Sequence, residues 1–192
     1  MKSGVSVRRL CLTALGAVIN IVCPFLSMAL HLPIFMDSIG TIFVTTLLGP
    51  KYGIMAGLAG SIISGISFDI YSLYYAPVQI LTACMAWLVM RGKWGKWPRM
   101  VFGGIAVSLP TALASAVITA AVFGGQTSSS TSYLVVLLQH MGVSLTAACF
   151  MVQILFEYLD KLTAMLLTRL ALSRLPLMKG VMFRGTVQQN HR

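Results

Sequence analysis

Carboxylate, tyrosine and amide side chains gather in the segments that separate the apolar runs of this chain. The stretch HLPIFMD ends at Asp37, and the stretch FDIYSLYY holds Asp69 and Tyr75. Gln79 follows Tyr75 by four residues, so the two share one face of a helix. If the apolar runs are membrane helices, ionisable groups at their ends are costly and usually face a cavity or a partner. These residues therefore favour a pocket for a small polar molecule.

Two further polar residues, Gln139 and His140, lie about two turns into the last apolar run, counted from its outer end. In the predicted pocket, Asp37 and Asp69 accept hydrogen bonds from hydroxyl, amine or ring N–H groups of a ligand. Tyr74 or Tyr75 stacks on the ligand's ring. The candidate substrate-binding residues are Asp37, Asp69, Tyr74, Tyr75, Gln79, Gln139 and His140.

Each of these residues also has a structural interpretation. Tyrosines at helix ends form an aromatic belt at the membrane surface, carboxylates in connections are solvated, and His140 within a helix suits a hydrogen bond between helices. The pocket is the better hypothesis because aromatic, carboxylate, amide and imidazole groups all fall on one side of the expected bundle. That side carries no Lys or Arg. The pocket is therefore expected to repel anions and to accept neutral or cationic ligands.

Sequence motifs for catalysis are missing. The chain has neither the GxxxxGK[ST] pattern that cradles ATP phosphates nor the zinc-binding HExxH pattern. Ser61 or Ser64 is a conceivable nucleophile with His140 as base, but no GxSxG surrounds either serine. The four cysteines lie in apolar runs without CxxC spacing, which is typical of small packing residues. The chain is expected not to be an enzyme and to hold no cofactor or metal.

The composition of the chain indicates which secondary-structure elements hold the predicted pocket. The 192 residues are 57% hydrophobic and only 9% charged, whereas soluble domains carry roughly 25% charged residues. Long apolar runs predict membrane helices of about 20 residues. We expect an all-α integral membrane protein with one domain, residues 1–192, and a basic cytoplasmic tail after about residue 171. The predicted six transmembrane helices fall at about 10–30, 34–49, 52–68, 73–90, 100–124 and 133–170.

The first apolar run resembles a signal peptide, but it is longer than the usual apolar region of about 7–15 residues and is followed by further runs. It is therefore interpreted as the first transmembrane helix.

The positive charges predict the orientation. In the six-helix arrangement, all 14 Lys and Arg residues fall on the side of the two termini, and the positive-inside rule makes that side cytoplasmic. Glu157, Asp160 and Lys161 are expected at the inner end of the last helix. The net charge of +10 is then a topology signal, with membrane lipids as partners and no nucleic acid. The expected location is the prokaryotic plasma membrane, with several spans.

The segment PIFMDSIGTIFVTTLLGPKYGIMAGLAGSI, residues 33–62, and the six-helix pattern resemble the substrate-binding S components of energy-coupling factor (ECF) vitamin transporters. The resemblance implies a subunit that captures a vitamin from outside. It also implies docking on a transmembrane scaffold subunit that carries two cytoplasmic ATPase subunits, so that this chain needs no ATP-binding motif of its own.

The resemblance also implies a docking face on the first helix, where such S components commonly carry two alanines four residues apart. This chain instead has small or polar residues at that spacing, which still permit close helix approach. The candidate partner-docking residues are Thr13, Gly16, Ala17 and Asn20.

The vitamin is inferred from charge. Folate, pantothenate and biotin are anions, whereas vitamin B6 compounds, thiamine and riboflavin are compatible with carboxylates and stacking tyrosines. Among S components, the sequence as a whole most resembles the pyridoxine type. An alternative from another class is a membrane sensor or scaffold that binds a small ligand or a partner without transport.

Overall fold

The computed structural model describes residues 6–90, 97–125, 127 and 131–174. Every regular element in this part of the chain is a helix, which confirms the all-α class. The helices are α1 Val7–Ala29, α2 Ile39–Leu48, α3 Pro50–Ser67, α4 Tyr71–Tyr74, α5 Ala76–Met90, α6 Trp97–Phe123, α7 Ser132–His140 and α8 Leu145–Arg174.

Two of the predicted helices differ from the structure. The run at 34–49 becomes helical only at Ile39, because residues 30–38 form an irregular connection in which His31 (φ 53°) and Met36 (φ 56°) take left-handed backbone angles. The run at 133–170 is divided into α7 and α8 by a turn at Gly142 (φ 88°). Glycine has no Cβ to clash at that angle, so the chain can turn there. The last run is therefore not one continuous span.

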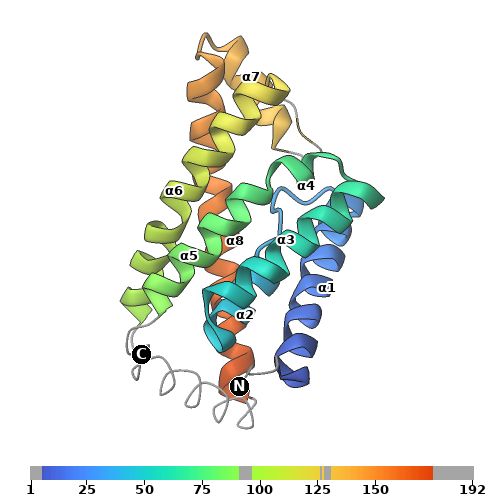
Figure 1. Ribbon diagram of the computed structural model, residues 1–192. Helices are drawn as coiled ribbons and strands as arrows, with labels where there is room; N and C mark the ends of the chain where they lie inside the picture. Colours follow the sequence, from blue (N-terminus) through green and yellow to red (C-terminus); the bar gives the residue numbers. More distant parts are fainter. Residues whose placement is uncertain (1–5, 91–96, 126, 128–130, 175–192) are drawn as a thin grey trace.

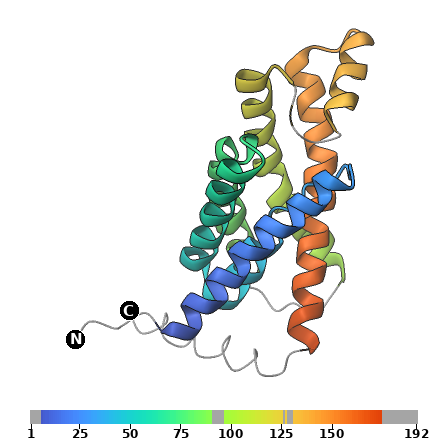
Figure 2. The same cartoon turned by 90° about the vertical axis from the view of Figure 1, so that its right-hand side faces the viewer.

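The short helix α2 lies in the lower half of the view in Figure 1, where it packs against α1, α3, α5 and α8. Eight of its ten residues are buried, including Ile42, Val44 and Thr41. The long helices α6 and α8 pair along their length and, with α7, extend beyond α1 and α3 at one end of the molecule (Figures 1 and 2). The connection 30–38 thus enters the bundle beside α8 rather than remaining on its outside.

Helices α1 and α2 approach closely at two glycines. A Cβ on Gly40 would meet the backbone carbonyl of Gly16, and one on Gly16 would meet the Val44 side chain. This contact covers the face of α1 that was expected to dock a partner. Thr13, Gly16, Ala17 and Asn20 are all buried within the chain's own bundle. The small-residue spacing is therefore used for intramolecular packing, and this face is not open to another subunit.

Two of the described helices, Val7–Ala29 and Met100–Phe123, are long and apolar enough to cross a membrane. The outward side of α1 carries Val18 and Val22, and that of α6 carries Phe102 and Leu113, all of them largely exposed. Contiguous apolar surface of this kind is typical of a protein that contacts lipid or another protein. The structure is compatible with a helical membrane protein.

The approach of α1 to α2 gives a first prediction. Gly40→Ala should lower the free energy of unfolding by about 1–3 kcal/mol, because the new methyl group meets backbone that cannot rotate away. Thermal unfolding in detergent measures the effect. Val18→Ala, on the exposed side of α1, is the control and should change stability far less. If Gly40→Ala is as stable as the parent, α1 and α2 are not in such close contact.

Candidate functional site

A cavity opens between the C-terminal end of α1, the connection 30–38, the α3–α4 junction and the facing sides of α5, α6 and α8. The space open to the centres of water molecules is about 130 Å³, many times the roughly 10–15 Å³ that one water requires. It therefore has room for a small organic molecule. Its polar lining consists of Ser27, His31, Asp37, Asp69, Ser72, Tyr75, Ser115, Gln153 and Glu157, and its aromatic lining includes Phe35, Phe68 and Tyr71.

Asp37 is held in the cavity wall by a chain of side-chain hydrogen bonds. The Gln79 amide donates to Asp37 Oδ2 at 2.9 Å, and Gln79 Oε1 accepts a hydrogen bond from Thr41 Oγ1 at 2.8 Å. Asn20 Nδ2 donates to Thr41 Oγ1 at 2.7 Å, and Asn20 Oδ1 accepts from Gly40 N at 2.7 Å. One continuous polar path therefore joins α1, α2 and α5 to the carboxylate of Asp37.

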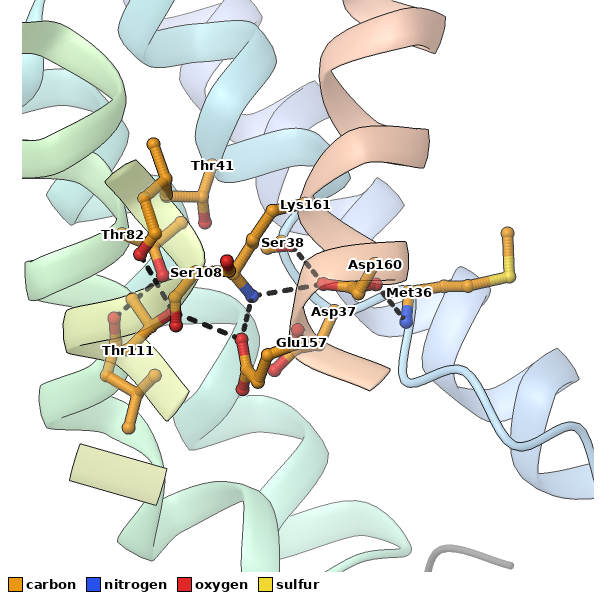
Figure 3. A network of polar contacts seen from close by, with 12 residues as sticks. Met36, Asp37, Ser38, Thr41, Thr82, Ser108, Thr111, Glu157, Asp160 and Lys161 are labelled. Atoms are coloured by element: carbon orange, nitrogen blue, oxygen red, sulfur yellow. Dashed lines mark hydrogen bonds and ion pairs between the residues drawn. The ribbon is translucent and has the colours of Figure 1, made fainter. Parts of the chain in front are cut away.

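A buried ion network lies behind the same wall (Figure 3). Lys161 Nζ is 2.8 Å from Glu157 Oε2 and 3.0 Å from Asp160 Oδ2. Asp160 accepts hydrogen bonds from Met36 N at 2.7 Å and from Ser38 Oγ at 2.5 Å, which ties α8 to the connection before α2. The network thus fixes the backbone on both sides of Asp37.

This network overturns the expected position of three charges. Glu157, Asp160 and Lys161 were predicted at the cytoplasmic end of the last helix, but they are 6%, 1% and 1% exposed, respectively, in the interior. Lys161 is therefore not a surface charge. One of the 14 basic residues carries no topology information, and Asp160 is a structural group rather than an inert surface carboxylate.

Glu157 also contributes to the cavity itself. Its Oε1 accepts a hydrogen bond from Ser115 Oγ at 3.0 Å, and its Oε2 accepts one from Thr111 Oγ1 at 3.3 Å. Gln153, one turn earlier on α8, donates to Thr119 Oγ1 at 3.1 Å. The wall formed by α6 and α8 is therefore polar along its length.

Tyr75 lines the cavity and, with the aromatic residues around it, packs against α6. The Tyr75 hydroxyl shares a hydrogen bond of 2.5 Å with Thr119 Oγ1. The rings of Tyr71 and Tyr74 pack edge-on against Phe123, with centroids 4.7 and 5.1 Å from its ring. This packing fixes the aromatic segment that borders the cavity.

Asp69 lies at the α3–α4 junction. Its Oδ2 accepts a hydrogen bond from Ser72 Oγ at 2.8 Å. Its Oδ1 is buried and has no hydrogen-bond partner among the described residues. A buried acceptor without a donor is costly, so this oxygen is suited to a donor that arrives with a ligand.

The structure brings together some of the predicted binding residues and separates others. Asp37, Asp69 and Tyr75 line the same cavity, and Gln79 donates a hydrogen bond to Asp37. Tyr74 is 48% exposed, packs on Phe123 and does not line the cavity. The break at Gly142 places Gln139 and His140 at the exposed end of α7, outside the cavity lining, and not within a span as predicted.

Several lining residues were missed, although a pattern in the sequence indicates them. On α8, Gln153, Glu157 and Lys161 recur every four residues and so lie on one helix face. The polar residues of α6 recur at intervals of three and four and face this stripe. They are Ser108, Thr111, Ser115 and Thr119. Matching polar stripes on two apolar helices predict a polar interface between them.

In the described part of the chain, no group of three or more His, Cys, Asp or Glu is arranged to hold a metal ion. No protein-family model matches the chain, and no curated protein or solved structure shows significant similarity to it. The chemistry of the site therefore follows from its own residues.

The buried network gives the second prediction. Lys161→Met should lower the free energy of unfolding by about 3–5 kcal/mol, because two buried carboxylates lose their counter-ion. Denaturant unfolding in detergent measures the loss.

Arg174→Met is the matched control, a basic residue at the exposed end of the same helix, and should cost less than about 0.5 kcal/mol. Equal, small effects of both substitutions would contradict the buried network.

Proposed function

We propose that this chain is the substrate-binding subunit of an ECF-type vitamin importer, and that it captures a neutral or cationic vitamin in the cavity described above. The observation that carries the proposal is the convergence of Asp37, Asp69 and Tyr75 on one cavity with aromatic walls. Carboxylates accept hydrogen bonds from a polar ring substituent, and a tyrosine offers a face for stacking. A vitamin B6 compound is the first candidate, followed by thiamine and riboflavin.

The charge of the wall supports this choice of ligand. The lining contains three carboxylates, and none of its described residues is a lysine or an arginine. Lys161 lies behind the wall, where it contacts Glu157 and Asp160. An anionic vitamin would meet uncompensated negative charge.

We further propose six membrane spans, formed by α1, α2, α3, α5, α6 and α8, with both termini in the cytoplasm of a prokaryotic cell. The start of α1, the α2–α3 junction, the end of α5, the start of α6 and the end of α8 lie at one end of the molecule (Figure 1). The basic residues in or next to these segments, such as Arg9, Lys51 and Arg174, support a cytoplasmic position for that end. Helix α2 is too short to cross a membrane alone and is shielded by its neighbours.

Transport requires partners under this proposal. A scaffold subunit with two ATPase subunits would supply ATP hydrolysis, since this sequence lacks the phosphate-binding motif. Because the Thr13–Asn20 face of α1 is internal, the scaffold contact is expected on the exposed side of α1, which carries Leu15, Val18 and Val22.

Ligand binding is the direct test. Mass spectrometry of molecules released from the denatured, purified protein should identify a B6 compound, thiamine or riboflavin. Calorimetric titration in nanodiscs should then show that Asp37→Asn and Asp69→Asn weaken binding about 10- to 150-fold, because each removes a charged acceptor.

His140→Ala, far from the cavity lining, is the control and should bind like the parent. The binding proposal is wrong if no vitamin binds. Vitamin binding in a protein that never associates with ATPase subunits would favour the sensor alternative.

Cysteine labelling tests the orientation in a variant that lacks the four native cysteines. Tyr133→Cys, at an 80% exposed position on α7, should react with a membrane-impermeant thiol reagent added outside intact cells. Lys51→Cys, at the opposite end, should react only after permeabilisation. The reverse pattern would refute the proposed topology.

A further inference from the structure

All four acidic residues of this basic chain lie in or directly behind the cavity. Asp37, Asp69 and Glu157 line it, and Asp160 contacts the Lys161 that also binds Glu157. Among the described residues, Lys161 forms ion pairs with two of these carboxylates, Glu157 and Asp160. The site thus concentrates the negative charge of a molecule whose net charge is +10.

The protein itself balances one of these four negative charges. The Lys161 ammonium lies between Glu157 and Asp160, and its side chain is 2% exposed. Both carboxylates have additional donors, from Ser115 to Glu157 and from Ser38 to Asp160. Lys161 is absent from the cavity lining, so it is a fixed internal counter-ion and not a ligand contact.

Asp37 and Asp69 make no direct ion pair with a lysine or arginine among the described residues, although Lys161 lies near enough to Asp37 to attract it. Asp37 receives a hydrogen bond from the neutral Gln79 amide, and Asp69 receives one from the Ser72 hydroxyl. Asp69 Oδ1 is buried without a hydrogen-bond partner. Both carboxylates share the cavity with the aromatic ring of Tyr75. A group that is both a cation and a hydrogen-bond donor would balance the charge of these two carboxylates and would donate to Asp69 Oδ1.

We infer that the cavity selects an organic cation, an aromatic ring bearing an ammonium-type group, whose charge is bound by the Asp37–Asp69 side of the wall. This inference rests on the proposed function and narrows its neutral or cationic vitamin to the cationic class. Lys161 balances one of the four negative charges from inside the protein, so a ligand cation meets a wall that remains negative.

Three probes share one pyridine ring and differ in the charge of one substituent. That substituent is an ammonium-bearing group in pyridoxamine, a neutral hydroxymethyl group in pyridoxine and a carboxylate in 4-pyridoxic acid. Calorimetric titration of the unmodified protein in nanodiscs should show pyridoxamine binding at least about 10-fold more tightly than pyridoxine, since hydrogen bonds between two charged groups are the stronger ones. The carboxylate probe should bind most weakly.

Two variants test the origin of the preference. Asp69→Asn keeps the shape of the side chain and removes its charge, so the ratio of the pyridoxine and pyridoxamine dissociation constants should fall at least about threefold. His140→Ala, outside the cavity lining, is the control and should leave that ratio unchanged. A purely structural role of Asp69 would weaken both probes equally and leave the ratio unchanged.

The outcomes distinguish this inference from the function on which it rests. Pyridoxine bound as tightly as pyridoxamine would overturn the selection of a cation while leaving vitamin capture intact. Binding of none of these probes, and of neither thiamine nor riboflavin, would remove the proposed function and this inference with it.

Discussion

The carboxylate of Asp160 is the contact on which the site depends. It binds Met36 N and Ser38 Oγ and thereby fastens an irregular stretch of backbone to α8 inside the bundle. Met36 has a left-handed φ of 56°, which is uncommon for a side chain of its size. Irregular backbone inside a helical bundle needs such internal partners because buried N–H and C=O groups are costly when unpaired. Through this bond, α8 determines where Asp37 projects.

The buried network places three charged side chains in the interior of the bundle. Replacing buried ion pairs by well-packed apolar residues is often neutral or stabilising, so the Glu157–Asp160–Lys161 network is weak evidence of a purely structural purpose. Its position explains it better. It lies between the cavity wall and the connection that carries Asp37, and it gives that wall a defined charge and shape before any ligand arrives. Preorganisation of this kind lowers the cost of binding.

Sequence reasoning predicted the all-helical class and brought Asp37, Asp69 and Tyr75 to one side because each follows or precedes an apolar run. It misplaced Gln139 and His140 because a single glycine, Gly142, ends α7 within an otherwise continuous apolar run. The charge-counting rule treats every lysine as a surface group. That assumption does not hold for Lys161, whose charge is compensated by Glu157 on the same helix face.

The small residues of α1 are a second case in which the sequence pattern predicted a contact but not the partner. Spacing of the type seen at Gly16 and Asn20 predicts that some helix approaches closely, but it does not say whether that helix belongs to the same chain. Asn20 supplies the missing information, because a buried amide needs polar partners. It finds them in Gly40 N and Thr41 Oγ1 of α2. Thr41 in turn donates to Gln79, which holds Asp37. A polar residue within a small-residue face therefore indicates packing inside the chain, and here it connects the packing of α1 to the geometry of the cavity that Asp37 lines.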